Sequence, residues 1–167
     1  VTGVQTCALP ICAVSVAGKA GTANAPIVVR AQDLNNKPVI SGSGASDAIK
    51  IDGSAYIYFS GLETTGGTQG MYLRASSHIV VQKSYIHDYG TSGNGILLSK
   101  SGQYSGGILL GDTFLFQDNT IANNSGSARS DGKIGIRIDN NGGSNVVMRR
   151  NTIYHNYDNI KMCQDED

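Results

Sequence analysis

The stretch from Gly70 to Asp88, GMYLRASSHIVVQKSYIHD, contains the unit that decides the fold. It holds an apolar triplet, Met71-Tyr72-Leu73, then a polar turn, a second triplet, Ile79-Val80-Val81, and a turn-and-strand segment from Gln82 to Asp88. Successive side chains of a β-strand point to opposite faces, so the outer residues of each triplet are expected to be buried and the central one exposed. The unit is therefore predicted to be three short strands that share one apolar side.

The same unit recurs along the chain. The first triplet has five copies, whose starts are separated by 22, 25, 40 and 24 residues. These copies are Ile49-Lys50-Ile51, Met71-Tyr72-Leu73, Ile96-Leu97-Leu98, Ile136-Arg137-Ile138 and Ile160-Lys161-Met162. The second triplet has four copies: Ile57-Tyr58-Phe59, Ile79-Val80-Val81, Phe114-Leu115-Phe116 and Val146-Val147-Met148.

A single unit of this kind cannot cover its own apolar side, whereas stacked units share one core. A spacing of 22 to 25 residues suits one coil of a parallel β-helix and leaves no room for the helix of a βαβ unit. The spacing typical of leucine-rich repeats is absent, and an antiparallel sandwich does not need the same register in successive units. The sequence predicts an all-β, right-handed parallel β-helix of about five to six coils, truncated at both ends.

The turn after the second triplet places polar residues at one repeated position. Ser84, Asn119 and Asn151 align there, and Leu62 takes the matching position in an earlier unit. Asn tolerates left-handed backbone dihedrals and can hydrogen-bond to its own turn and to the turn stacked on it. We therefore expect a polar ladder, with polar turn residues of no special role as the alternative.

Composition excludes several classes of protein. The 167 residues include 13 basic and 13 acidic side chains, so no excess of positive charge points to nucleic acid as a partner. There is no run of about eighteen apolar residues that would span a membrane. No metal-binding His/Cys spacing and no phosphate-binding glycine loop occurs.

The first eleven residues, VTGVQTCALPI, resemble the translation of a short-read sequencing adapter. Residues 1–12 are therefore expected to lie outside the fold, leaving a partial β-helix domain over residues 13–167. The resemblance implies a fragment of an environmental sequence that lacks its natural start and any signal peptide. Since Cys7 and Cys12 belong to this segment or its junction, only Cys163 is assigned to the native chain and no internal disulfide is expected.

Three segments carry a family resemblance: GKAGTANAPIVVRAQ (Gly18 to Gln32), DAIKIDGSAYIYFSGLE (Asp47 to Glu63) and SSHIVVQKSYIHDYG (Ser76 to Gly90). Over residues 13–162 the chain resembles the pectate-lyase-like superfamily, most nearly its chondroitinase-B-like and alginate-lyase-like branch. The resemblance implies a bacterial protein, secreted or on the cell surface, that cleaves an acidic polysaccharide by β-elimination. It also implies a Lys/Arg pair and often a Ca²⁺ held by Asn and Glu.

The Asn-x-Glu calcium motif of that branch has no match in these residues. We therefore expect no metal site within this chain. Any Ca²⁺ is expected to bind elsewhere in the full-length parent protein. The resemblance assigns no catalytic residue to this chain. These coils alone are expected to be inactive as a lyase.

The central residues of the first triplet are predicted to form one outward row: Lys50, Tyr72, Leu97, Arg137 and Lys161. Strands of a sheet are about 4.8 Å apart, which is comparable with the rise of a sugar along a glycan. Cations neutralise a uronate carboxylate during β-elimination, so Lys50, Tyr72, Arg137 and Lys161 form the candidate glycan groove. The alternative is a solvated face whose Lys and Arg stems pack on their neighbours.

Two function hypotheses stay open. One is a polysaccharide lyase, and the other is a non-catalytic surface, adhesin or phage tail-spike module that binds glycans. These share the fold, which does not fix the function. Insertions at Ser99 to Asp112 and Ser125 to Lys133 suit either a binding face or tolerated decoration. Uncapped ends are expected to make the fragment self-associate.

Overall fold

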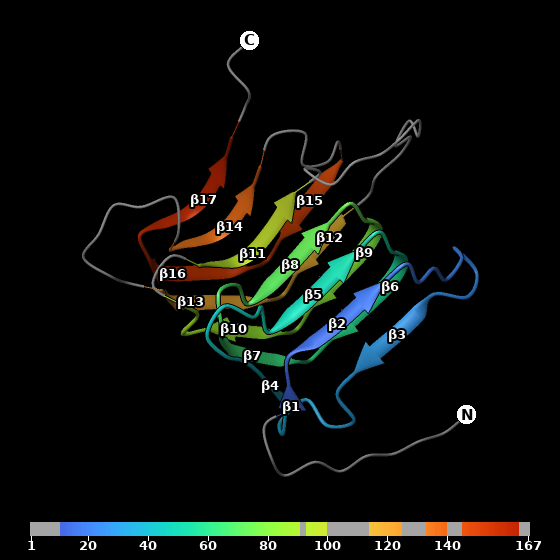
Figure 1. Cartoon of the computed structure of the whole chain (residues 1–167), viewed down its shortest axis with the longest axis horizontal. Helices are drawn as coiled ribbons and strands as arrows, with labels where there is room; N and C mark the ends of the chain where they lie inside the picture. Colours follow the sequence, from blue (N-terminus) through green and yellow to red (C-terminus); the bar gives the residue numbers. More distant parts are fainter. Residues whose placement is uncertain (1–10, 91–92, 100–113, 125–132, 140–144, 164–167) are drawn as a thin grey trace.

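The computed structural model describes residues 11–90, 93–99, 114–124, 133–139 and 145–163. These residues form seventeen strands and no helix, and every strand pair is parallel. The strands build three sheets, here named A, B and C, which surround a single core (Figure 1).

Sheet A contains β1 (Ile11–Cys12), β4 (Val39–Gly42), β7 (Glu63–Gly66), β10 (Tyr85–His87), β13 (Thr120–Asn124) and β16 (Thr152–Asn156). Sheet B contains β2 (Val14–Ala17), β5 (Ile49–Asp52), β8 (Met71–Arg74), β11 (Asn94–Ser99), β14 (Ile134–Ile138) and β17 (Asp158–Met162). Sheet C contains β3 (Ile27–Arg30), β6 (Ala55–Ser60), β9 (Ser77–Gln82), β12 (Phe114–Gln117) and β15 (Val146–Arg149).

The chain visits sheets A, B and C in turn, so three consecutive strands make one coil. The described residues complete five coils and begin a sixth with β16 and β17. The predicted right-handed parallel β-helix is confirmed. The structure adds a coil that the repeat analysis did not count, in which Val14-Ser15-Val16 and Ile27-Val28-Val29 supply the two triplets.

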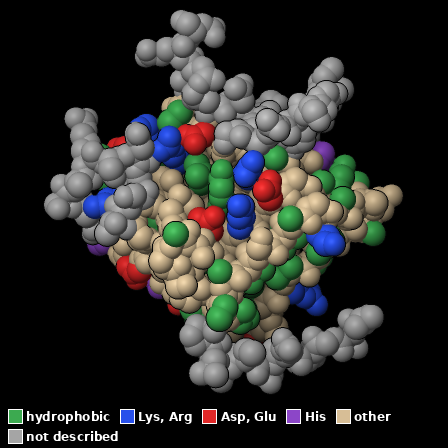
Figure 2. Space-filling view, in the orientation of Figure 1, with side chains coloured by type: hydrophobic (Ala, Val, Ile, Leu, Met, Phe, Trp, Pro, Cys, Tyr) green, Lys and Arg blue, Asp and Glu red, His purple; other side chains and the backbone are tan. Residues whose placement is uncertain are grey.

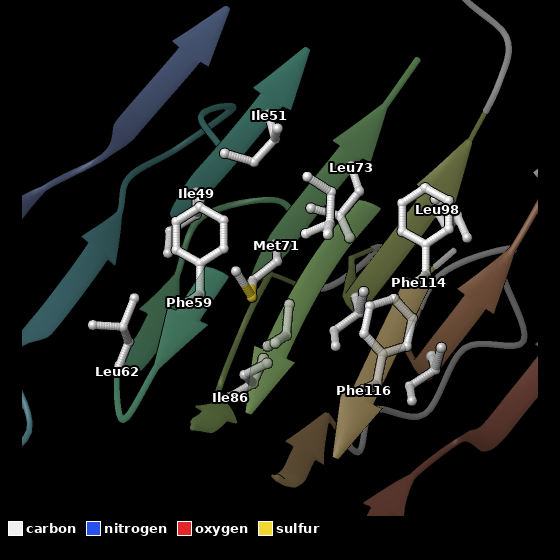
Figure 3. Close-up of a cluster of buried hydrophobic side chains, with 14 of the residues drawn as sticks. Ile49, Ile51, Phe59, Leu62, Met71, Leu73, Ile86, Leu98, Phe114 and Phe116 are labelled. Atoms are coloured by element: carbon white, nitrogen blue, oxygen red, sulfur yellow. The ribbon is translucent and has the colours of Figure 1, made fainter. Parts of the chain in front are cut away.

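The predicted register between triplets is also confirmed. Ile49 pairs with Met71, Met71 with Ile96, and the pairing continues through Ile136 to Ile160. The outer residues of the first four copies are buried, and they pack against the second triplets that face them across the core (Figure 3). Phe59, Phe114 and Phe116 are the largest of these buried side chains.

Both ends of the described part of the β-helix are open. At one end the inward-facing Ile160 and Met162 are 48% and 66% exposed, and at the other the inward-facing Ile27 and Val29 are 38% and 37% exposed. Ile11 and Cys12 form β1, which pairs with Ile40 and Ser41 of β4. The side chains of Ile11 and Cys12 are exposed. No helix among the described residues has the length and apolarity needed to cross a membrane.

The ladder after the second triplet is present, with one correction. Leu62, Ser84, Asn119 and Asn151 stack as expected, but the left-handed backbone belongs to the residue before each of them. The residues with positive φ are Gly61 (70°), Lys83 (53°), Asp118 (55°) and Arg150 (53°). The side chains at the ladder position instead bond to the neighbouring coil, where they satisfy backbone groups inside the turn.

Candidate functional site

The outer face of sheet B carries the predicted row. The register of the sheet places Lys50, Tyr72, Leu97, Arg137 and Lys161 in line along the helix axis. Each of these side chains is half-buried, so the expectation that Lys50, Tyr72 and Arg137 are exposed is corrected. Neighbours only about 4.8 Å away on both sides cover the flanks of each side chain and leave mainly its tip in water.

Lys50 and Tyr72 form one end of this row. The Lys50 ammonium lies over the Tyr72 ring, 5.8 Å from its centroid, which is within the range of a cation–π contact. Asp47 lies beside Lys50 at the start of β5. Burial raises the pKa of the Asp47 carboxyl, while Lys50 and a hydrogen bond from the Gln69 backbone N–H act in the opposite direction.

A second outward row runs beside the first. Asp52 pairs with Arg74 across β5 and β8, and Arg74 pairs with Ser99 across β8 and β11. An Arg74 guanidinium nitrogen lies 3.7 Å from an Asp52 carboxylate oxygen, and Arg74 Nε is buried with no hydrogen-bond partner among the described residues. Arg74 thus adds a cation to this face that the repeat analysis did not select.

Arg137 and Lys161 form the other end of the row. Arg137 Nε donates a hydrogen bond of 2.6 Å to Asp139, two residues further along the chain. Asp52 and Asp139 therefore both partner cations of this face. Three strand spacings separate Lys50 from Arg137, which corresponds to about 14 Å.

The geometry therefore gives two cationic groups separated by Leu97, with carboxylates interleaved. Figure 2 shows basic and acidic side chains side by side on this face, among hydrophobic ones. On such a surface a ligand carboxylate reaches a cation by competing with the protein carboxylate already beside it. It does not present one continuous basic stripe.

Within the described residues, no group of three or more His, Cys, Asp or Glu side chains could hold a metal ion.

The other predicted features lie elsewhere. His87 pairs in register with Ala122, and Ala122 with Tyr154, so His87 and His155 are out of register by one residue. The two predicted insertions fall mainly on residues 100–113 and 125–132, outside the described part of the chain. Cys12 and Cys163 are free thiols.

Known proteins resemble this fold. An alginate lyase from Paenibacillus sp. str. FPU-7 has a similar structure, with a TM-score of 0.62 and 20% sequence identity. The match covers 86% of this chain and 51% of the lyase, so the chain spans about half the length of that enzyme. No curated protein has a sequence that matches this chain. The family described as the right handed beta helix region matches residues 35–165, more than half of the chain, and the chain therefore belongs to that family.

Proposed function

We propose that this β-helix binds an acidic, uronate-containing polysaccharide along the outer face of sheet B, and that its parent protein is a polysaccharide lyase. The observation that carries the proposal is the alignment of Lys50, Tyr72, Arg137 and Lys161 in one row along the axis. The likeness of the fold to an alginate lyase supports it.

The row suits a polymer better than a small molecule. Lys50 and Arg137 are separated by about 14 Å, a distance of roughly three strand spacings, so one carboxylate cannot reach both. A glycan that runs along the axis places successive sugars over successive coils. Tyr72 offers a ring beside Lys50, where a sugar can pack its apolar face while its carboxylate contacts the ammonium.

In β-elimination, a cation neutralises the uronate carboxylate, a base removes the proton alpha to it, and the leaving oxygen gains a proton. Lys50, Arg74 and Arg137 are suited to the first of these tasks. We assign the base, the proton donor and any Ca²⁺ to parts of the parent protein outside the described residues. We further propose that the parent is secreted or held at the cell surface, where it meets polysaccharides.

A second candidate function is glycan binding without cleavage, as in a surface, adhesin or tail-spike module. The pairs Arg137–Asp139 and Arg74–Asp52 favour it, because a carboxylate holds each guanidinium in place on this face, where it serves as a binding group. Both candidates predict binding of acidic glycans by this chain.

The test measures binding of oligoalginate and oligogalacturonate by calorimetry, together with the ultraviolet absorbance of unsaturated products. Lys50→Ala and Arg137→Ala are each expected to weaken binding about fivefold, since a half-exposed ionic contact contributes about 1 kcal/mol. Lys83→Ala and Arg30→Ala, whose exposed side chains lie away from sheet B, are the matched controls and should change little.

We expect binding without turnover by this chain. Turnover that Lys50→Ala or Arg137→Ala abolishes would show that these coils hold the catalytic site, contrary to the assignment above. Equal losses in all four variants would indicate nonspecific attraction rather than a groove. The lack of any acidic-glycan binding would contradict the proposed function.

A further inference from the structure

The outer face of sheet A carries a group of side chains that the proposed function does not use. We name it the His87 cluster, and it consists of Glu63, Tyr85, His87, Asp88 and Tyr154. Glu63, Tyr85 and Tyr154 come from β7, β10 and β16, and the cluster therefore spans several coils of the helix.

His87 holds two carboxylates in place. Its Nε2 lies 3.1 Å from Glu63 Oε1, one coil earlier, and its Nδ1 lies 2.7 Å from Asp88 Oδ2. Both ring nitrogens thus lie within hydrogen-bond distance of a carboxylate oxygen, and the ring holds the two acids side by side on this face.

The two carboxylates still have hydrogen-bonding capacity. Each uses one oxygen for His87, and no bond is formed by Glu63 Oε2 or Asp88 Oδ1 to any described residue. The Glu63 side chain is 29% exposed and that of Asp88 is 57% exposed, so these oxygens can be reached from solvent. Carboxylate oxygens are strong acceptors for hydroxyl groups.

Aromatic rings complete the face. The Tyr85 ring stacks on His87, with centroids 3.9 Å apart and planes 17° from parallel. Tyr154 lies two strands further along the row that contains His87 and is 39% exposed. Burial raises the pKa of Tyr85, and the Tyr154 phenol and the carboxylates of Asp88 and Glu63 raise it further. Ala122, between His87 and Tyr154 in register, is fully buried.

The charge of this cluster differs from that of the sheet B face. Two carboxylates outnumber the single imidazole ring, so the cluster carries a net negative charge and repels a uronate. An uncharged sugar has hydroxyl donors for the free carboxylate oxygens and C–H faces for the tyrosine rings.

From this geometry we propose that the His87 cluster is a second carbohydrate site, which binds an uncharged sugar unit through Tyr85, Tyr154 and the free oxygens of Glu63 and Asp88. The site is independent of the acidic-glycan groove on sheet B. A chain with both faces would attach to a neutral glycan through one and to an acidic glycan through the other.

The test uses linear neutral hexasaccharides of glucose, mannose and galactose as probes, with binding measured by calorimetry or by NMR shifts of the full chain. At least one probe should bind with a millimolar or tighter Kd. Tyr154→Ala is expected to weaken that binding at least fivefold, whereas Tyr157→Ala, which removes a similarly exposed tyrosine beyond the end of β16, should not.

Two further variants separate this site from the groove and from a folding defect. Glu63→Gln keeps the shape of the side chain and should also weaken neutral-sugar binding at least fivefold, while the double variant Lys50→Ala/Arg137→Ala should leave it unchanged. Thermal unfolding of each variant verifies the fold. The absence of binding by all three probes, or equal losses in Tyr154→Ala and Tyr157→Ala, would overturn the proposal.

Discussion

The Oδ1 atom of Asn119 accepts a hydrogen bond of 3.0 Å from the backbone N–H of Ser84 in the preceding coil. Asn151 Oδ1 likewise accepts a hydrogen bond from the backbone N–H of Asn119. The hydroxyl oxygen of Ser84 accepts one from the backbone N–H of Leu62. The three turns that lead into β7, β10 and β13 are thus each closed by a side chain from the next coil. A buried N–H without such a partner would lose free energy on folding.

Asn119→Ala should therefore destabilise the protein by about 2–4 kcal/mol, because it leaves the N–H of Ser84 and the carbonyl of Val81 unpaired in a buried turn. Chemical denaturation measures the loss. Asn36→Ala, at an exposed turn position, is the control and should change the free energy of unfolding by less than about 0.5 kcal/mol. Similar losses in the two variants would show that the ladder does not contribute.

Thr64 carries a polar atom inside the core. It is fully buried on the inward side of β7, and its hydroxyl has no hydrogen-bond partner among the described residues. Thr64→Val replaces that hydroxyl with a methyl group of similar size and should stabilise the fold by about 1 kcal/mol. Thr65→Val, on the outward side of the same strand, is the comparison. A lower melting temperature for Thr64→Val would mean that the hydroxyl has a partner after all.

Tyr89 links three coils from a buried position. Its hydroxyl donates to Asn156 Oδ1 at 2.9 Å and approaches the carbonyl oxygen of Ile134 at 3.3 Å, and burial raises the pKa of the phenol far above 10. The folded state therefore holds this proton more tightly than the unfolded state, so the stability that Tyr89 contributes is present below pH 10 and falls as the pH rises above it.

Tyr89→Phe should accordingly cost about 1 kcal/mol at pH 7. The difference in unfolding free energy between the two proteins should shrink above about pH 10, the ordinary pKa of tyrosine. Urea unfolding at pH 7 and at pH 10 to 11 compares them, and the other tyrosines cancel in the difference. A gap that widens with rising pH would contradict the assigned direction.

The open ends of the described helix predict self-association. The inward-facing Ile27 and Val29 are exposed at one end, and Ile160 and Met162 at the other. These residues lie on strands that pair on one side only among the described residues. The mass measured by light scattering should therefore fall on dilution. Ile160→Lys with Met162→Lys should lower the mass at every concentration, and a mass that is constant across the dilution series in the unchanged protein would refute the prediction.

The repeat could be predicted because its pattern is local. In each first triplet two apolar residues flank an outward one, such as Lys50, Tyr72 or Arg137. Aligning the triplets then gives their register from coil to coil. The first coil was not counted, since Val14-Ser15-Val16 is short and follows directly on the segment that resembles an adapter.

Contacts between coils were harder to predict. Arg74 contacts Asp52 because the two residues pair in register across β5 and β8. An alignment of the residue that follows each first triplet would have placed them side by side. The bond from His87 to Glu63 joins residues 24 positions apart and depends on how two side chains extend across the strands. Spacing alone does not give that geometry.

The central claim, that sheet B binds acidic glycans along its outer row, is tested most directly by titrating the isotope-labelled protein with a hexameric oligouronate and following its NMR spectrum. Shifts should concentrate at Lys50, Tyr72, Arg137 and Lys161, and should weaken as salt screens the ionic contacts. Shifts confined to sheets A or C, or no saturable shift at low salt, would contradict the claim.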